Sequence, residues 1–351
     1  MQRVAIIGPG GAGKSTLARR LGEVTGLPVI HLDNEYWRPG WVATPEDQWS
    51  RRVDVLAAGD RWIIDGNFGG TMAPRLERAD TVVYLDFERH LYIWRVLKRR
   101  FKHRDRGRSR PDMAEGCEEK IDWVFLKWLW NYRASRRPAA LRLTADAHRQ
   151  GKRVVILRDD RQTEAFVRGA MAGPGDAPRP TASNKVMLVG APAAGKTTLA
   201  KRLSERTGLP VVDPAAWLHS ASGRMDGRTH HQRIAAAVAE PAWIVDEALL
   251  QTLGLQLVAS DLTICLDTAT HLRIWRCLRR ARARRMEGRS LGMRFEAKTL
   301  LSTLLFPQTE RRRVMRALGR VASAQPVFVV RNSEEAEAVL AGLAPSARAG
   351  A

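Results

Sequence analysis

A glycine-rich segment near the N-terminus, GPGGAGKS from Gly8 to Ser15, matches the G-x-x-x-x-G-K-[ST] pattern of a phosphate-binding loop (P-loop). It follows a strand-like apolar run at 4–7 and precedes a helical stretch, a context in which backbone N–H groups hold phosphate oxygens. We expect Lys14 to reach the β and γ phosphates of ATP and the Ser15 hydroxyl to bind Mg²⁺. The predicted nucleotide-binding residues are Gly8, Gly10, Gly11, Gly13, Lys14, Ser15 and Thr16.

A second P-loop begins at Gly190, and the chain around it repeats the first copy. GPGGAGKSTLARRLGEVTGLPV is mirrored by GAPAAGKTTLAKRLSERTGLPV, WIIDGN by WIVDEA, and HLYIWRVLKRR by HLRIWRCLRRA. These matches predict a duplication that has since diverged. The predicted nucleotide-binding residues of the second copy are Gly190, Gly195, Lys196, Thr197 and Thr198.

Two aspartates end predicted strands of the first copy. Asp65 ends WIID, where a carboxylate can hold Mg²⁺ or its water from the side opposite Ser15, although a helix-capping Asp is the alternative. In the second copy, Asp246 and Thr197 take the corresponding metal-binding places. Asp86 ends YLD directly before a helical stretch, and we expect it to cap that helix.

The acceptor side of the predicted site centres on Asp33, at the end of PVIHLD. In a parallel sheet, ligands gather at the carboxyl ends of the strands, so Asp33 is a candidate to orient or deprotonate an acceptor hydroxyl; an ordinary turn Asp is the alternative. Trp37, Asn67 and Arg75 lie in predicted loops at the same edge and are candidate substrate-binding residues. For Trp37, as for Trp41, packing is the commoner role.

Arg95 and Arg99 lie one helical turn apart and share a face of the predicted helix. They open a basic segment at 98–111, KRRFKHRDRGRSRP, in which Arg110 is a further candidate for substrate binding. Phosphoryl transfer needs cations that close over the migrating phosphate, and an arginine-bearing lid supplies them. A solvated charged helix and a strip that follows a nucleic-acid backbone are the alternatives.

Short apolar runs at 4–7, 28–32, 62–64, 81–85 and 153–157 alternate with helical stretches. Continuous apolar strands separated by helices predict a parallel sheet covered on both faces, so each copy should be a three-layer α/β/α sandwich. The predicted domains are 1–168 and 185–343, joined by a linker at 169–184 that is rich in Gly, Pro and Ala. A frayed tail is expected at 344–351.

The composition limits the class of protein. With 44% hydrophobic and 27% charged residues in 351, the chain is typical of folded proteins with two domains, and its apolar runs are far shorter than a membrane span. No signal peptide is evident, so we expect a cytoplasmic protein that does not bind membranes. The net charge of +21 attracts polyanions, so nucleic acid is a possible partner besides nucleotides.

Taken together, GPGGAGKSTLARRL, HLDNEYWRPGW, WIIDGNFGGT, ADTVVYLD, WRVLKRR and RSRPDM resemble the adenylate-kinase-related proteins known as DNA topology-modulation, or FlaR-type, proteins. The resemblance covers nearly all of 1–168. It implies an adenylate-kinase-like fold, ATP with Mg²⁺, a magnesium role for Asp65 and lid roles for Arg95 and Arg99. Asn67-Phe68 replaces the Phe-Pro-Arg run of adenylate kinases, so AMP is not the expected acceptor.

The sequence therefore predicts an ATP-dependent kinase for a small acceptor whose identity stays open, as does the oligomeric state. The alternative is an ATP-dependent protein that associates with nucleic acid and affects DNA topology; a regulatory scaffold with little turnover is a third possibility. We expect the second domain to bind nucleotide but to transfer phosphoryl groups poorly. Its acceptor edge has changed: Ala215 stands for Asp33, Glu247-Ala248 for Gly66-Asn67, and Gln256 for Arg75.

Overall fold

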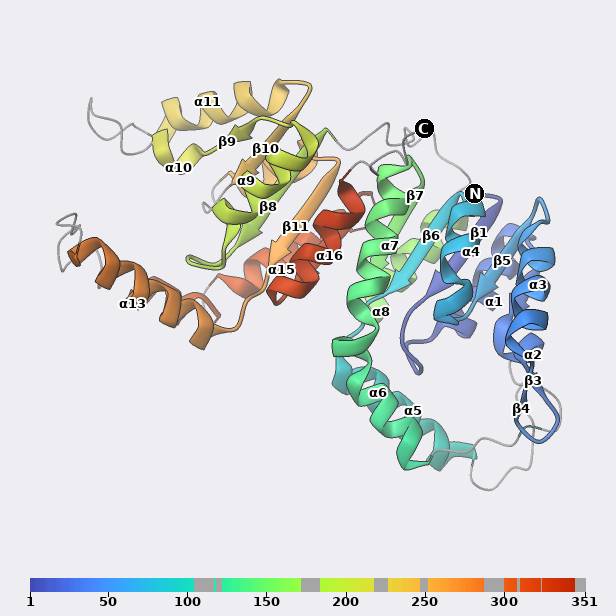
Figure 1. Cartoon of the computed structure of the whole chain (residues 1–351). Coiled ribbons are helices and arrows are strands. Elements are labelled where there is room, and N and C mark those ends of the chain that lie inside the picture. The colour runs from blue at the N-terminus through green and yellow to red at the C-terminus, as the bar shows by residue number, and fades with distance from the viewer. Residues whose placement is uncertain are drawn as a thin grey trace, which may run out of the picture. The chain divides into compact units, whose positions relative to one another are not determined.

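The structure is a computed structural model with two compact units, Met1–Thr181 and Ala182–Ala351 (Figure 1). It describes residues 1–103, 117, 122–171, 184–217, 227–246, 252–286, 300–307, 310–322 and 324–344. Helix α8, Asp160–Met171, extends three residues past the predicted domain boundary at residue 168. The rest of 169–184 up to residue 183, and the tail from residue 345, lie outside the described residues.

The first unit is built on a five-stranded sheet in which all strands are parallel. Its order is β2-β5-β1-β6-β7, so the strand that leads into the P-loop is central. All strands predicted from the sequence are present, and only the second is shorter than predicted. Their bounds are β1 Arg3–Ile7, β2 Val29–His31, β5 Trp62–Asp65, β6 Thr81–Leu85 and β7 Arg153–Leu157.

Helices cover both faces of this sheet (Figure 1), with α1 packing on α8, and α4 packing on α3 and α7. A two-stranded antiparallel ribbon of β3 and β4 follows α2. The bounds are α1 Lys14–Thr25, α2 Leu32–Tyr36, β3 Trp37–Arg38, β4 Val42–Ala43, α3 Glu46–Ala57, the 3₁₀ turn η1 Gly69–Thr71, α4 Met72–Arg78, α5 Arg89–His103, α6 Trp123–Ser135 and α7 Arg137–Arg149.

The second unit has its own parallel five-stranded sheet, in the order β12-β11-β8-β10-β9. Read from β9, this is the strand order of the first unit. Strand bounds are β8 Lys185–Gly190, β9 Val211–Val212, β10 Trp243–Asp246, β11 Leu262–Leu266 and β12 Val327–Val330. The helices are α9 Lys196–Thr207, α10 Pro214–Trp217, α11 Gly227–Ala239, α12 Leu253–Ala259, α13 Thr270–Met286, a helix at 300–307, α15 Arg311–Val321 and α16 Ser333–Leu343.

The two units are mixed α/β structures with parallel sheets, as predicted. No helix among the described residues combines the length and apolar character needed to cross a membrane. Each sheet carries its own hydrophobic core, which fixes the strand ends from which the P-loops emerge.

His148 of α7 is a buried titratable group in the first unit. Neither ring nitrogen has a hydrogen-bond partner among the described residues. Burial lowers the pKa of His148 to about 4, because the charged imidazolium loses its hydration. In an unfolded chain the pKa of His148 is about 6.5, so below that pH the unfolded chain binds a proton that the folded chain does not. The stabilisation that the neutral imidazole gives is therefore complete above about pH 6.5 and is lost as the pH falls towards about 4.

We predict that His148 alone lowers the unfolding free energy by about 2 kcal/mol between about pH 7 and about pH 5. His148→Leu should remove that part of the loss and leave the rest of the pH profile unchanged. Urea unfolding of both proteins at the two pH values measures the difference. His90→Leu, at an exposed position of α5, is the matched control. Parallel profiles for wild type and His148→Leu would contradict the prediction.

Candidate functional site

The first P-loop leaves β1 and enters α1 through glycines that no other residue replaces easily. A Cβ at Gly8 would lie 2.7 Å from the Leu85 carbonyl oxygen, and Gly8 has a φ of 146°. Gly13, at the start of α1, is left-handed with a φ of 95°. The Lys14 ammonium donates to the Pro9 carbonyl, 3.2 Å away, so it lies across the loop that it is predicted to complete.

The second P-loop has the same form with one local difference. Lys196 donates to the carbonyl oxygens of Gly190 and Ala191 at 3.1 and 3.3 Å. Where the first loop has Gly11 with a φ of 78°, the second has Ala193 with a φ of 58°. A left-handed alanine costs about 1 kcal/mol or more, so the second loop keeps its shape under strain.

The two predicted metal-binding pairs differ between the units. In the second, the Thr197 hydroxyl donates to Asp246 at 2.5 Å, so the two side chains predicted to bind Mg²⁺ lie within hydrogen-bond distance of each other. Adjacent hydroxyl and carboxylate oxygens fit the preference of Mg²⁺ for oxygen ligands. Within the described part of the chain, no three His, Cys, Asp or Glu side chains are placed to hold a metal ion together.

In the first unit, Asp65 is paired with His31, a residue that the sequence analysis did not single out. The His31 Nδ1 lies 2.5 Å from the Asp65 Oδ1, and both side chains are largely buried. The pairing follows from strand register, because His31 on β2 lies directly opposite Asp65 on β5. The pair was missed because neither the end of β2 at His31 nor the adjacency of β2 and β5 is visible in the sequence.

The loop after β5 is tied to the P-loop by Asn67. Its side-chain oxygen accepts from the Gly8 N–H at 2.9 Å, so Asn67 lies at the predicted site. Arg75 corrects our prediction of a loop residue facing substrate. It lies in α4 with a fully buried side chain and donates to the carbonyls of Gly66, Asn67 and Phe68.

Arg75 is therefore a positioning residue for the loop that carries Asn67. Burial lowers the pKa of Arg75 to about 10, while the nearby Asp65 carboxylate raises it. The group stays charged at neutral pH.

Arg95 lies against the P-loop. Its guanidinium donates to the Ala12 carbonyl at 3.2 Å and to both oxygens of Asp160 at 2.7 and 2.8 Å, and it lies over the Phe87 ring. Arg99 follows one turn later on α5. Arg110 lies outside the described residues, and so does the basic segment from residue 104. In the second unit, Arg276 makes the equivalent contact with Ala194 at 2.8 Å.

On the acceptor side, Asp33 corrects our prediction of a strand-end residue. β2 ends at His31, and Asp33 lies in the first turn of the short helix α2, with an exposed side chain. Trp37 packs edge-on against Tyr36 and Trp41, at centroid distances of 4.7 and 5.2 Å. Its contacts are those of a packing residue that borders the site.

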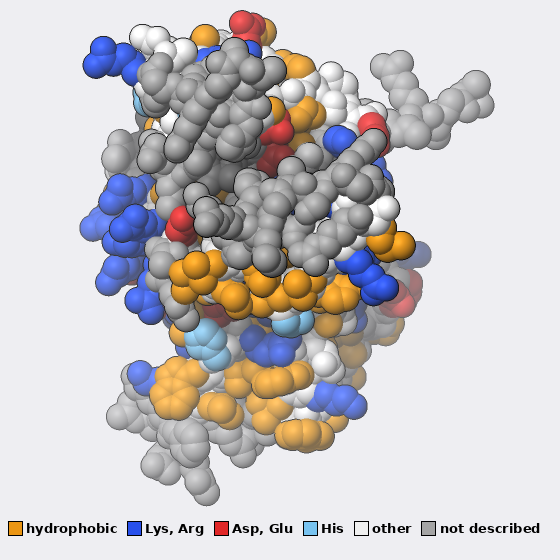
Figure 2. Space-filling view, turned by 90° about the vertical axis from the view of Figure 1, so that its left-hand side faces the viewer, with side chains coloured by type: hydrophobic (Ala, Val, Ile, Leu, Met, Phe, Trp, Pro, Cys, Tyr) orange, Lys and Arg blue, Asp and Glu red, His pale blue; other side chains and the backbone are white. Residues whose placement is uncertain are grey.

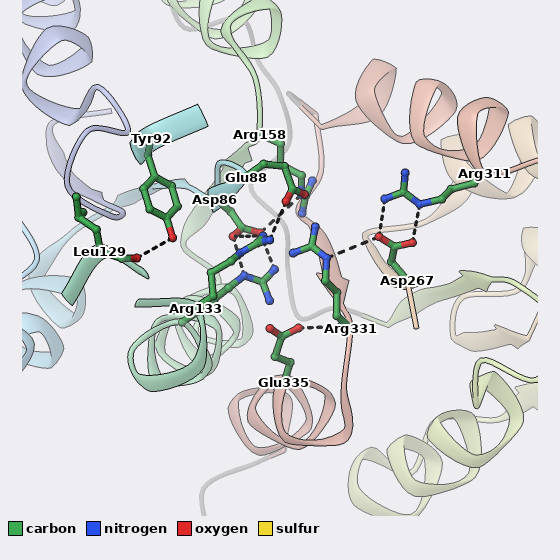
Figure 3. A network of polar contacts seen from close by, with 11 residues as sticks. Asp86, Glu88, Tyr92, Leu129, Arg133, Arg158, Asp267, Arg311, Arg331 and Glu335 are labelled. Atoms are coloured by element: carbon green, nitrogen blue, oxygen red, sulfur yellow. Dashed lines mark hydrogen bonds and ion pairs between the residues drawn. The ribbon is translucent and has the colours of Figure 1, made fainter. Parts of the chain in front are cut away.

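Asp86 is not the helix cap that we predicted. Both carboxylate oxygens accept from Arg137 at 2.7 Å, and Arg158 and Arg133 lie 3.8 and 3.9 Å away (Figure 3). Burial raises the pKa of Asp86, but Arg137, with help from Arg158 and Arg133, outweighs burial and holds that pKa below its usual range.

The second unit repeats this ion pair. Asp267 accepts from Arg311 at 2.8 and 2.7 Å, and Arg331 lies 3.7 Å from the same carboxylate (Figure 3). Sequence reasoning missed both pairs because the partner arginines are 51 and 44 residues away along the chain.

No protein-family model matches the sequence, and no curated protein matches it. A solved gluconokinase from Sinorhizobium meliloti 1021 is similar to it at 15% identity, over 46% of this chain and 91% of that chain, with a TM-score of 0.30. A likeness of this size defines neither an activity nor a substrate. The two parallel sheets and the glycine-rich loops at the ends of their central strands fit a P-loop α/β fold.

Proposed function

We propose that the first unit is an ATP-dependent phosphotransferase that acts on a small hydroxyl compound. The observation that carries the proposal is the convergence of Lys14, Asn67 and Arg95 on the backbone of one glycine-rich loop. In P-loop kinases, rate acceleration comes from positioning and from charge stabilisation around the transferred phosphoryl group. This convergence supplies both.

The proposed reaction gives each group a place. Lys14 would shift from the Pro9 carbonyl to the β and γ phosphates. Mg²⁺ held at Ser15 and Asp65 would neutralise phosphate charge, with His31 orienting the Asp65 carboxylate. The acceptor oxygen forms a bond to the γ-phosphorus while the bond between the γ-phosphorus and the β–γ bridging oxygen breaks. Asp33, on α2, is our candidate to receive the hydroxyl proton.

The experiment is an ADP-release assay on the purified full chain against sugars, nucleoside monophosphates and other small hydroxyl compounds. We predict stimulation by at least one compound that is not a nucleotide, and weak stimulation by nucleoside monophosphates. A strong AMP-dependent release of ADP would restore adenylate kinase activity. No stimulation by any acceptor would leave the protein without its proposed activity.

For the second unit we propose nucleotide binding with little transfer, in a copy that arose by duplication. The shared strand order supports the duplication, and the contacts of Lys196, Thr197 and Arg276 support nucleotide binding. We predict that Lys196→Ala removes one of two nucleotide sites per chain and leaves turnover within about threefold of wild type. Equilibrium binding of a non-hydrolysable ATP analogue measures the first effect and ADP release the second. A large loss of turnover would assign transfer to the second unit.

A second candidate function is association with single-stranded nucleic acid. Trp123 and Trp130 of α6 are 78% and 59% exposed, and exposed aromatic rings next to Lys and Arg can stack on bases. Figure 2 shows hydrophobic side chains beside Lys and Arg on the surface that faces the viewer. Binding that weakens steeply with salt and is reduced in Trp123→Ala would favour this function over a purely metabolic one.

A further inference from the structure

A cavity of about 210 Å³ lies in the second unit where β11 ends and α13 begins. Its lining includes Ala191 of the P-loop, Asp267, Thr268, Arg273, Phe306 and Arg311. The volume is several times the roughly 30 Å³ that one water molecule occupies in the liquid. A space of this size, lined by apolar residues together with charged and polar side chains, can take a small polar ligand.

Arg273 is the unusual residue of this lining. Its side chain is 2% exposed, and Nη2 donates to the Thr270 hydroxyl at 2.8 Å. Among the described residues, Nε and Nη1 have no hydrogen-bond acceptor. The guanidinium carbon lies 5.4 Å from the centre of the Phe306 ring, a contact that offers no lone pair. A buried cation with unused donors is costly, and an anion would relieve that cost.

Two of the corresponding residues in the first unit are aromatic. Tyr92 stands 181 residues before Arg273 and donates to the Leu129 carbonyl at 3.1 Å, within the hydrophobic core. Phe87, 181 residues before Thr268, belongs to the same core. The second unit therefore has an arginine and a threonine where the first unit packs two aromatic rings, although the strand order around them is unchanged.

The charges around the cavity favour an anion. Both oxygens of Asp267 are held by Arg311, and Arg331 lies 3.7 Å from the same carboxylate, so Arg273 is an additional positive charge (Figure 3). Glu88 of the first unit is replaced here by Ala269, 181 residues later, which removes a carboxylate. Burial lowers the pKa of Arg273, and Asp267 opposes that shift. The first turn of α13 adds backbone N–H groups with the positive end of a helix dipole.

We propose that this cavity binds a small oxyanion, a phosphate or carboxylate group, through the Arg273 guanidinium and the first-turn N–H groups of α13. The site lies behind the P-loop, because Ala191 lines it and the Thr268 hydroxyl donates to the Ala194 carbonyl at 3.2 Å. Binding there needs no nucleotide and no phosphoryl transfer, so it stands apart from the proposed activity.

The test uses the full chain with Lys14→Ala and Lys196→Ala, which weaken phosphate binding at both P-loops. Thermal unfolding and isothermal titration are measured with sodium phosphate and with sodium acetate, against sodium chloride at equal ionic strength. We expect one of the two anions to raise the Tm and to bind at one site per chain. A response to phosphate alone identifies a phosphate group, and a response to acetate identifies a carboxylate.

Arg273→Met, added to the same background, should abolish the response and should not lower the Tm in chloride, because it removes a buried charge whose Nε and Nη1 lack acceptors among the described residues. Should Arg273→Met fail to fold, Arg273→Lys keeps the charge but loses the planar fork, and its affinity should fall about tenfold or more. Tyr92→Phe, at the matching position of the first unit, should leave the response unchanged. No response to either anion in the parent, or a response that persists in Arg273→Met, overturns the proposal.

Discussion

Replacing Lys14 by alanine should reduce acceptor-stimulated ADP release by about a hundredfold or more, which corresponds to about 3 kcal/mol of transition-state stabilisation. The ammonium lies across the P-loop at the Pro9 carbonyl, where β and γ phosphates would meet it. Arg95 is the neighbouring cation, but Asp160 and the Ala12 carbonyl hold its guanidinium. Arg95 therefore cannot take over the place of the missing ammonium without breaking these bonds.

Lys196→Ala is the matched control, because Lys196 makes the equivalent contact in the second P-loop, with the Ala191 carbonyl. The two variants should separate cleanly: Lys14→Ala loses turnover, and Lys196→Ala loses only a nucleotide site. Circular dichroism and thermal unfolding should show that both variants stay folded. Turnover of Lys14→Ala within about threefold of wild type, a difference below about 1 kcal/mol, would mean that the first P-loop is not the catalytic one.

The sheet and the P-loops were predictable because their signals are local. Each strand of the first unit is a continuous apolar run, and a glycine-rich turn after such a run specifies its own backbone. Asp33 shows where local reasoning ends. The sequence continues PVIHLD as if it were one strand, yet β2 stops at His31 and α2 begins at Leu32. Asp33 and Glu35 in that first turn favour a helix start, since they complement its dipole.

The roles of the buried polar groups depend on partners far along the chain. Arg75 looks like a surface cation in the sequence, but the carbonyls of Gly66, Asn67 and Phe68 turn towards it and satisfy its donors. That arrangement requires a φ of 143° at Gly66 and 31° at Phe68, which no sequence pattern shows. The His31–Asp65 pair depends on strand register in the same way.

The second large effect concerns Asp86, whose removal should lower the unfolding free energy of the first unit by about 3–5 kcal/mol. Both carboxylate oxygens of Asp86 accept from Arg137 at 2.7 Å, and the Arg137 side chain is 0% exposed. Asp86→Ala therefore leaves the buried, charged Arg137 without these two hydrogen bonds. The pKa of Asp86 is held low by Arg137. This stabilisation is therefore complete at neutral pH and is lost only as the pH falls through the depressed value.

The second unit offers the matched comparison for this prediction, since Asp267 is bound by Arg311 in the same two-point geometry but the Arg311 side chain is 40% exposed. Water can solvate Arg311 when its partner is removed, so Asp267→Ala should cost clearly less than Asp86→Ala. Hydrogen exchange of the β6 and β11 amides, followed by mass spectrometry, reports the unfolding free energy of each unit separately.

Asp86→Leu combined with Arg137→Met should recover much of the lost unfolding free energy, because an apolar pair leaves no buried charge unmatched. Equal costs in the two units, or no recovery in the double variant, would show that burial of the arginine does not set the energy of this pair.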